Sequence, residues 1–306
     1  MPMSTDPLPK LIAVVGPTAS GKTSLSVALA ARFGGEIVSA DSRQIYRGMD
    51  IGTAKATPAE QAAVPHHLID IKDPDEDYTV ADFRHDAMAA IGDILARGRT
   101  PILAGGTGLY VRAVTENLDI PPAKADPTLR AAIEKEVETE GLEAVFRKLV
   151  ARDPEAEYIV DPRNPRRVVR ALEVAILTGE PFTAQRRRSA PVFDVLEIGL
   201  NPPSDVLRPR IDARIDEMMA AGLVDEVRGL VARYGARIPA LDAIGYREIV
   251  AHLEGRDTLE GAVAAMKMNT WHYAKRQVTW FKKDKDIRWI ADAREAAQLT
   301  EAFLKK

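Results

Sequence analysis

Cysteine is absent from this chain of 306 residues. Its absence excludes disulfides, zinc sites built on thiolates and cysteine nucleophiles. Long apolar runs are missing as well. The first ten residues hold no apolar segment of signal-peptide length, and no later stretch approaches the roughly 20 apolar residues that a membrane-spanning helix needs. We therefore expect a cytoplasmic protein that makes no membrane contact.

The chain also lacks an excess of positive charge. It has 42 Lys and Arg against 45 Asp and Glu, a formal net charge of −3. This balance argues against bulk electrostatic attraction to nucleic acid, so any nucleic-acid surface has to be local. Apolar residues make up 46% of the chain, enough at this length for about two domains with a full core.

A glycine-rich loop near the N-terminus carries the strongest motif. Apolar residues 11–15 predict a buried strand that Gly16 ends, and residues 23–32 have a helical pattern. Between them lies G-x-x-x-x-G-K-T, the P-loop signature in its strand-to-helix context, where backbone amides face a polyphosphate. The diphosphate-binding residues expected here are Gly16, Thr18, Ala19, Ser20, Gly21, Lys22 and Thr23. The alternative is a glycine-rich turn without a ligand.

Within this loop, Lys22 would reach the outer phosphate as a point charge and the Thr23 hydroxyl would bind Mg²⁺. The motif indicates a ligand that carries a diphosphate, which need not be ATP.

Two further predicted strands end in polar or glycine-rich turns. Residues 36–39 run into Asp41-Ser42-Arg43-Gln44, and residues 100–104 run into Gly105-Gly106-Thr107-Gly108. The carboxyl ends of parallel strands lie at one edge of a sheet, so Asp41 and Thr107 should face the same crevice as the P-loop. A turn-capping role for Asp41 is equally compatible with its position.

The order of these elements predicts an α/β fold with a P-loop NTPase-like parallel sheet flanked by helices. From residue 123 to 189 the apolar residues recur at helical spacing, which indicates an all-helical insertion domain, and residues 192–199 return to strand character. The catalytic core would then comprise residues 1–122 and 190–306 with C-terminal helices. We expect residues 48–65 to form an irregular loop over the site.

Basic residues gather in three parts of the chain. Arg210 and Arg214 share one helix face, which suits a diphosphate clamp. Residues 275–282 interleave basic and aromatic side chains, as single-stranded nucleic-acid surfaces do, although buried Trp280 and Phe281 with basic residues outside fit equally well. The insertion has seven clustered arginines with few balancing acids, which favours a phosphate-backbone surface over a solvated helix face: Arg163, Arg166, Arg167, Arg170, Arg186, Arg187 and Arg188.

Together these motifs resemble those of the bacterial tRNA dimethylallyltransferase family, in order and over nearly the whole chain. The matching segments are Gly-Pro-Thr-Ala-Ser-Gly-Lys-Thr at 16–23, Asp-Ser-Arg-Gln-Ile-Tyr at 41–46, Gly-Gly-Thr-Gly-Leu-Tyr at 105–110, Gly-Tyr-Arg at 245–247 and Lys-Arg-Gln at 275–277. The resemblance implies transfer of a dimethylallyl group from its diphosphate to the adenine just 3′ of the anticodon, with a need for Mg²⁺. The zinc finger of eukaryotic relatives is absent, which indicates the bacterial form.

The resemblance also implies roles for single residues. Asp41, Thr107, Lys22 and Arg214 would be catalytic, with Asp41 taking a proton from the adenine amine. Contacts with tRNA would come from Asp41, Ser42, Arg43, Gln44, Thr107, Arg130, Arg166, Arg167, Arg170, Gly245, Tyr246, Arg247, Lys275, Arg276 and Gln277. The expected partners are dimethylallyl diphosphate and the tRNA anticodon stem-loop, which the insertion would grip. No obligate protein partner is evident, and we expect a monomer.

Three other functions remain open at this point. A small-molecule kinase shares the P-loop and Mg²⁺ but leaves the basic insertion unexplained. An enzyme that prenylates free adenine nucleotides keeps the core motifs, but the arginines of the insertion disfavour it. A GTP-binding switch protein would need a guanine-reading N-K-x-D motif, of which residues 123–126 lack the Asn.

Overall fold

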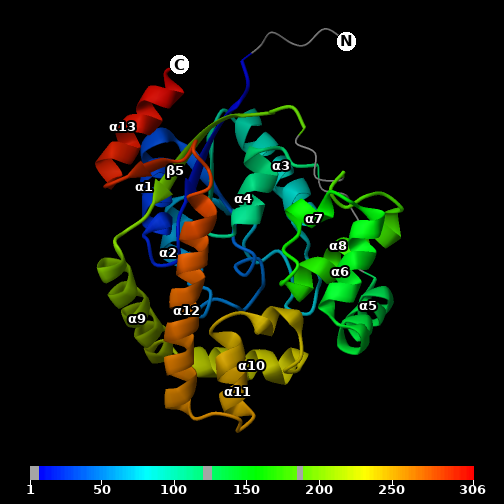
Figure 1. Cartoon of the computed structure of the whole chain (residues 1–306). Coiled ribbons are helices and arrows are strands. Elements are labelled where there is room, and N and C mark those ends of the chain that lie inside the picture. The colour runs from blue at the N-terminus through cyan, green and yellow to red at the C-terminus, as the bar shows by residue number, and fades with distance from the viewer. Residues whose placement is uncertain (1–6, 120–125, 185–188) are drawn as a thin grey trace. The chain divides into compact units, whose positions relative to one another are not determined.

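The computed structural model describes residues 7–119, 126–184 and 189–306 (Figure 1). Contacts divide the chain into two compact units, one of residues 1–115 and 191–306 and one of residues 116–190. The second unit begins a few residues before the boundary expected at 123. The functional roles of the two units remain predictions.

A parallel sheet forms the centre of the first unit. Its strands are β1 (Lys10–Val15), β2 (Gly35–Ser39), β3 (His66–His67), β4 (Thr100–Gly105), β5 (Asp194–Leu200) and β6 (Arg288–Ile290). Their order across the sheet is β3-β2-β4-β1-β5-β6, and every pairing is parallel. The α/β fold and its parallel sheet are confirmed. Central β1 therefore has its carboxyl end between those of β4 and β5, where the P-loop begins.

Helices cover both faces of the sheet, which explains why β1 is apolar throughout. Leu11, Ala13 and Val15 pack with α3 (Val80–Ala96) and α4 (Gly108–Thr115). Ile12 and Val14 pack with α1 (Lys22–Phe33) and α13 (Ala293–Leu304) on the other face. Successive side chains of a strand alternate between faces, so a strand buried on both reads as a continuous apolar run.

Local signals set several helix ends as the sequence predicts. Gly34 ends α1 in the left-handed conformation at φ 62°, which a residue without Cβ adopts at little cost. Thr79 and Asp82 form a reciprocal capping box at the start of α3. These caps satisfy backbone groups that the helix itself leaves unpaired.

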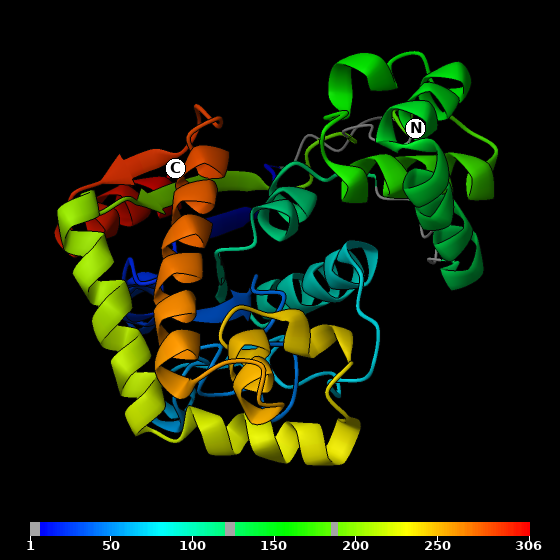
Figure 2. The same cartoon turned by 60° about the horizontal axis from the view of Figure 1, so that its bottom comes forward.

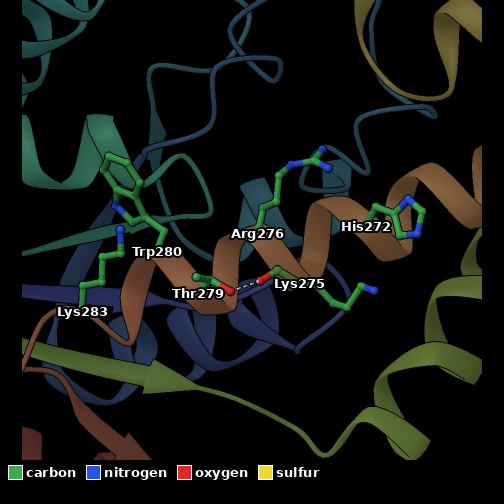
Figure 3. Close-up of a pocket in the computed structure, with 6 residues that line it drawn as sticks. All are labelled: His272, Lys275, Arg276, Thr279, Trp280 and Lys283. Carbon is green, nitrogen blue, oxygen red and sulfur yellow. Dashed lines mark hydrogen bonds between the residues drawn. The ribbon is translucent and has the colours of Figure 1, made fainter. Parts of the chain in front are cut away.

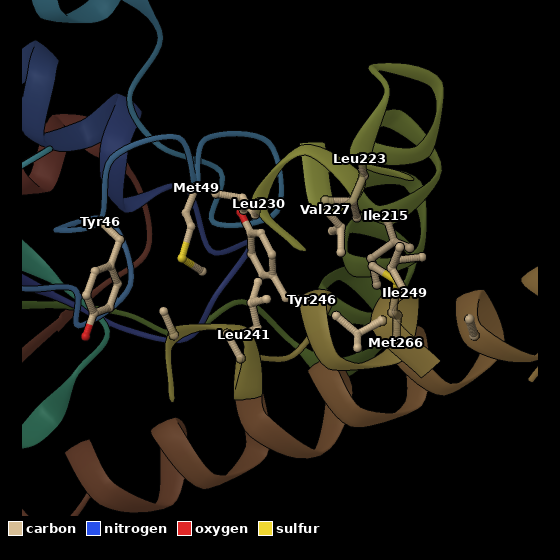
Figure 4. Packing of buried hydrophobic residues seen from close by; sticks show 14 of the residues in the cluster. Tyr46, Met49, Ile215, Leu223, Val227, Leu230, Leu241, Tyr246, Ile249 and Met266 are labelled. Atoms are coloured by element: carbon tan, nitrogen blue, oxygen red, sulfur yellow. The ribbon is translucent and has the colours of Figure 1, made fainter. Parts of the chain in front are cut away.

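Four helices of the first unit pack into a separate group beside the sheet: α9 (Ser204–Ala220), α10 (Leu223–Tyr234), α11 (Tyr246–Leu253) and α12 (Leu259–Phe281). Figure 2 shows them gathered together, with the short 3₁₀ helix η1 (Pro239–Asp242) leading into α11. Their core also takes in Ile45, Tyr46 and Met49 from the segment after β2 (Figure 4). This burial anchors the segment that follows the predicted Asp41 turn to the helical group.

The second unit is helical within the part that the structure describes, as the periodicity predicts. Its helices are α5 (Pro127–Glu140), α6 (Leu142–Arg152), α7 (Ala156–Ile159) and α8 (Pro165–Thr178). Ile133, Val145, Leu149 and Val168 are fully or almost fully buried at their centre. This unit thus has its own hydrophobic core.

Two sequence expectations need correction. The stretch 48–65 is not wholly irregular, because α2 (Pro58–Ala63) forms there behind a Thr57 and Glu60 capping box. The C-terminal α13 was not expected, although Ala296, Ala297 and Phe303 lie at the spacing of a buried helix face. Among the described helices, none is long and apolar enough to cross a membrane.

Candidate active site at the P-loop and neighbouring strand ends

The P-loop connects β1 to α1 through tightly constrained backbone. Gly16 has φ 147°, and a Cβ there would lie 2.4 Å from the carbonyl oxygen of Leu200. Ala19 adopts a left-handed φ of 60°, and Gly21 caps α1 at φ 93°. The hydroxyl of Ser20 is buried without a hydrogen-bond partner in the described chain. The loop therefore holds a strained backbone and an unsatisfied polar group, as a ligand cradle does.

Lys22 folds back over this loop, with Nζ donating to the carbonyl oxygen of Pro17 at 2.6 Å. The pKa of Lys22 is lowered to about 8, mainly by burial and to a smaller extent by the Arg214 charge, while the Asp41 carboxylate opposes both. These effects require all three residues to lie close together. The structure thus brings together Lys22, Asp41 and Arg214, which are 192 positions apart at the extremes. Arg210 is exposed on α9, one turn before Arg214.

Asp41 follows β2 and organises the turn after it. One carboxylate oxygen accepts hydrogen bonds from the backbone N–H groups of Arg43 at 2.8 Å and Gln44 at 3.4 Å. The capping role is therefore real. The other carboxylate oxygen accepts no hydrogen bond from the residues that the structure describes, so it is free for a ligand.

Ser42, Arg43 and Gln44 are held by neighbouring elements. The guanidinium of Arg43 donates to the carbonyl oxygen of Pro239 at 3.3 Å. The Gln44 amide accepts from the Ser39 hydroxyl at 3.1 Å and donates to the carbonyl oxygens of Thr53 and Ala54. The Gln44 amide therefore ties the turn to the segment before α2.

Thr107 reaches this turn from the end of β4. Its backbone N–H donates to the carbonyl oxygen of Ala40 at 3.2 Å, and its hydroxyl oxygen accepts from the Ser42 N–H at 3.1 Å. The predicted convergence of strand ends on one crevice is thus present in the structure. The catalytic and RNA-binding roles of these residues remain predictions.

Sequence reasoning missed Tyr273 on α12. Burial, together with the nearby Asp41 charge, raises the pKa of Tyr273 to about 12. It stays a neutral phenol that can donate or accept beside Asp41. Tyr273 lies one turn before Gln277, so helical spacing from the Lys-Arg-Gln motif was the signal available.

Gln277 lies on the inner face of α12, only 6% exposed. Lys275 and Arg276 are exposed, while Phe281 is buried and the Trp280 ring packs against Gly108. A shallow pocket runs along this helix, lined by His272, Lys275, Arg276, Thr279, Trp280 and Lys283. Figure 3 shows His272 at one end of the row and Trp280 with Lys283 at the other. The exposed part of α12 is thus cationic with aromatic neighbours.

The Gly-Tyr-Arg segment at 245–247 mostly lies inside the helical group. Tyr246 has no exposed surface, and its hydroxyl donates to Glu226 at 2.6 Å. The Gly245 N–H donates to Glu248, and the guanidinium of Arg247 pairs with the same carboxylate at 2.8 Å. Burial leaves Tyr246 no surface for a direct RNA contact in this structure.

The arginines of the second unit that the sequence singles out divide into two groups. Arg130 and Arg170 bind the fully buried Glu173 carboxylate at 2.8 and 2.9 Å. Burial alone would raise the pKa of Glu173, but these hydrogen bonds hold it below its usual range. Arg170, a member of the predicted basic cluster, is therefore balanced by an acid, and Arg130 outside that cluster shares the same carboxylate.

The second group, Arg163, Arg166 and Arg167, is exposed and makes no ion pair with any residue that the structure describes. Arg186, Arg187 and Arg188 lie outside the described residues. The exposed arginines at and just before the start of α8 are thus among the available cations of this unit.

A divalent cation at the P-loop would be held by few protein ligands, together with phosphate oxygens and water. The described chain holds no cluster of three or more His, Cys, Asp or Glu side chains that could bind a metal alone. Mg²⁺ keeps several waters and commonly takes few protein ligands beside phosphate oxygens. The Thr23 hydroxyl at the start of α1, next to Lys22, matches that demand.

The parallel sheet, the loop between β1 and α1 and the helices on both faces define a P-loop-type α/β protein. The family model described as "IPP transferase" matches residues 44–284, and on this evidence the chain belongs to that family.

Relatives match over almost their whole length. The tRNA dimethylallyltransferases of Roseiflexus castenholzii and Streptomyces coelicolor are 50% and 46% identical, with at least 97% of each chain covered. The crystal structure of the Bacillus halodurans tRNA isopentenylpyrophosphate transferase matches with a TM-score of 0.71 and 44% identity over 97% of this chain and 95% of that one. A eukaryotic dimethylallyltransferase acting on tRNA matches with a TM-score of 0.82 and 28% identity, over 97% and 80%.

Proposed function

We propose that this protein transfers a dimethylallyl group from dimethylallyl diphosphate to the exocyclic amine of the adenine just 3′ of the anticodon in tRNA, as a tRNA dimethylallyltransferase. The observation that carries the proposal is the meeting of two chemically opposite groups at one sheet edge. Lys22 and Arg214 supply positive charge for a leaving group, while Asp41 and Thr107 offer acceptors for an amine. A full-length likeness to enzymes of this name supports it.

On the leaving-group side, the bond from C1 of the dimethylallyl group to the diphosphate oxygen breaks, and both electrons leave with the diphosphate. The P-loop amides, Lys22 and Arg214 stabilise that charge as it develops. Thr23 would hold Mg²⁺, which when bound neutralises charge on the diphosphate oxygens. The ligand is dimethylallyl diphosphate, so ATP is not required for the transfer.

On the acceptor side, the exocyclic nitrogen forms the new bond to C1 and loses one proton. Its lone pair is delocalised into the adenine ring, so it is a weak nucleophile that benefits from a base. The unpartnered oxygen of Asp41 accepts that proton, while the other oxygen keeps the turn in shape. Thr107, which accepts from the Ser42 N–H, orients the base.

The adenine has to leave the stack of the anticodon loop to reach this crevice. Backbone phosphates of the tRNA would meet the exposed cations of α12 and of the start of α8, including Lys275, Arg276 and Arg166. Aromatic neighbours on α12 suit unstacked bases of a single-stranded loop.

The test is a transfer assay with purified protein, Mg²⁺, radiolabelled dimethylallyl diphosphate and unmodified tRNA, with ATP binding measured alongside. We expect label on one adenine of the anticodon loop. Absence of label together with tight ATP binding would overturn the proposal in favour of a kinase.

Replacing Asp41 separates its two roles. Asp41→Asn keeps an oxygen that accepts from the Arg43 N–H but removes the base, so we expect turnover to fall about 100-fold or more with tRNA affinity little changed. Asp41→Ala loses the cap as well and should be no more active. If Asp41→Asn turned over at the wild-type rate, Asp41 would only be a cap.

A further inference from the structure

We propose that Gln277 is a positioning residue that holds the diphosphate loop and the adenine-side turn in register with each other. This inference rests on the proposed function. Its side-chain oxygen accepts from the backbone N–H of Thr18 at 2.8 Å, and its side-chain nitrogen donates to the carbonyl oxygen of Gly106 at 2.9 Å. One amide thus links loops that follow two different strands, 259 and 171 positions away in the chain.

The fit around this amide leaves no room for a side chain at 106 unless the amide moves. A Cβ on Gly106 would lie 2.3 Å from the side-chain nitrogen of Gln277, well inside any real contact distance. Any larger residue would push the amide away from both of its partners. The position of the Gln277 amide therefore depends on the absence of a side chain at residue 106.

The chemistry of the two bonds selects an amide. The loop side offers a donor and the turn side an acceptor, and a carboxamide presents an acceptor and a donor on one planar group without having to be protonated. A glutamate would set an oxygen against the Gly106 carbonyl, and a shorter Asn would not span both loops. Gln277 is 6% exposed, so water does not readily replace either bond.

Each of the two hydrogen bonds is made to a residue next to one half of the candidate site, the diphosphate loop or the adenine-side turn. Thr18 precedes Ala19, whose left-handed backbone leads to Lys22. Gly106 precedes Thr107, which accepts from the Ser42 N–H beside Asp41. The amide therefore sets the distance between the leaving group and the attacking amine rather than binding either ligand.

Such a role affects the rate more than binding. Group transfer needs the reacting atoms about 3 to 3.5 Å apart and aligned, and a displacement of about 1 Å costs roughly 100-fold. Both half-sites would remain intact when the link is lost. We therefore expect kcat to fall while the KM for each substrate stays nearly unchanged.

The decisive variant is Gln277→Met, which keeps the side-chain length and removes both hydrogen bonds. We expect kcat per folded molecule to fall about 10- to 100-fold, with both KM values within about threefold of wild type. The matched control is Gln61→Met on α2, where the Gln61 amide donates to the Ala56 carbonyl just before the helix, and this variant should leave kcat unchanged. An unchanged kcat in Gln277→Met, or a loss that only tracks the folded fraction, would overturn the proposal.

A second variant covers the case in which Gln277→Met folds poorly. Gly106→Ala should lower kcat in the same way, and the double variant should be little worse than either single one, because both changes break the same link. Additive losses would contradict a shared link.

Hydrogen exchange tests the link without relying on catalysis. Gln277→Met should speed exchange of the Thr18 amide on one loop and loosen the 105–108 turn on the other, even if wild type transferred no label. Failure of the transfer assay in wild type would thus refute the proposed function alone. Unchanged exchange at both loops would refute the role of Gln277.

Discussion

At the scale of single residues, Lys22 is poised to change charge near neutral pH. In the ligand-free protein, burial lowers its pKa to about 8, and a bound diphosphate would raise that value again. The charged form is the one that holds diphosphate. Diphosphate binding is therefore strongest below pH 8, where Lys22 is already charged. Above pH 8, Lys22 has to take up a proton when the diphosphate binds.

We expect the affinity for inorganic diphosphate to fall by up to about tenfold per pH unit above pH 8. Lys22→Arg provides the reference, because a guanidinium stays charged throughout this range and the ionisation of the ligand itself is common to both proteins. Calorimetric titration between pH 7 and 9.5 measures the ratio of the two affinities. A ratio that does not vary with pH would mean that Lys22 does not touch the diphosphate.

At the scale of elements, Glu226 on α10 holds the segment between β2 and α2. Its carboxylate accepts from the backbone N–H groups of Asp50, Ile51 and Gly52 at 3.1, 2.7 and 3.1 Å, and from the Tyr246 hydroxyl. The carbonyl oxygens of the next two residues, Thr53 and Ala54, accept hydrogen bonds from the Gln44 amide. The Glu226 carboxylate therefore supports the Asp41 turn indirectly. It fixes the backbone of residues 50–52, and the neighbouring carbonyl oxygens bind Gln44 of the turn.

Glu226→Ala should lower the free energy of unfolding by about 2 to 3 kcal/mol, because several hydrogen bonds to a charged acceptor are lost together. Trypsin should also cut faster at Lys55 in the released segment. The neighbouring Asp225→Ala is the control, since Asp225 is exposed and its ion pair with Arg228 contributes less than about 1 kcal/mol. Urea unfolding and timed proteolysis measure both effects, and equal behaviour of the two variants would argue against the clamp.

At the scale of the whole molecule, the net charge is −3, so attraction to RNA depends on the cations that acids do not pair with. In the second unit, Glu173 binds Arg130 and Arg170, so these two stabilise the fold. Arg166 and Arg167 remain exposed at the start of α8. Only exposed cations can release counterions from RNA phosphates.

The double variant Arg166→Ala and Arg167→Ala should reduce the slope of log affinity for tRNA against log salt concentration by roughly 1 to 2, with an unchanged melting temperature. Arg130→Ala should instead lower the melting temperature, because it removes a partner of the buried Glu173 carboxylate. Filter binding at several salt concentrations and thermal unfolding separate the two outcomes. An unchanged slope in the double variant would remove α8 from the tRNA surface.

Much of the fold was predictable from the sequence because its signals are local. The strand before Gly16, the capping box at Thr79 and the helical spacing from 127 to 178 each depend on residues within a few turns. The P-loop could be identified for the same reason. Convergence of Asp41 and Thr107 followed from the rule that parallel strands end at one edge. The α13 helix was missed although its spacing was present, and α2 was missed within a stretch poor in pattern.

The sequence by itself determined the α/β fold, the P-loop signature between a strand and a helix, and the helical character of residues 127–178, since backbone conformation and apolar period depend on neighbouring residues. Only the tertiary structure decided which motif residues face a ligand and which face the protein. Tyr246 is buried against Glu226, and Gln277 bridges Thr18 and Gly106. These contacts join segments from about 20 to 260 positions apart, and no local pattern records such pairings because they arise when separate elements pack together.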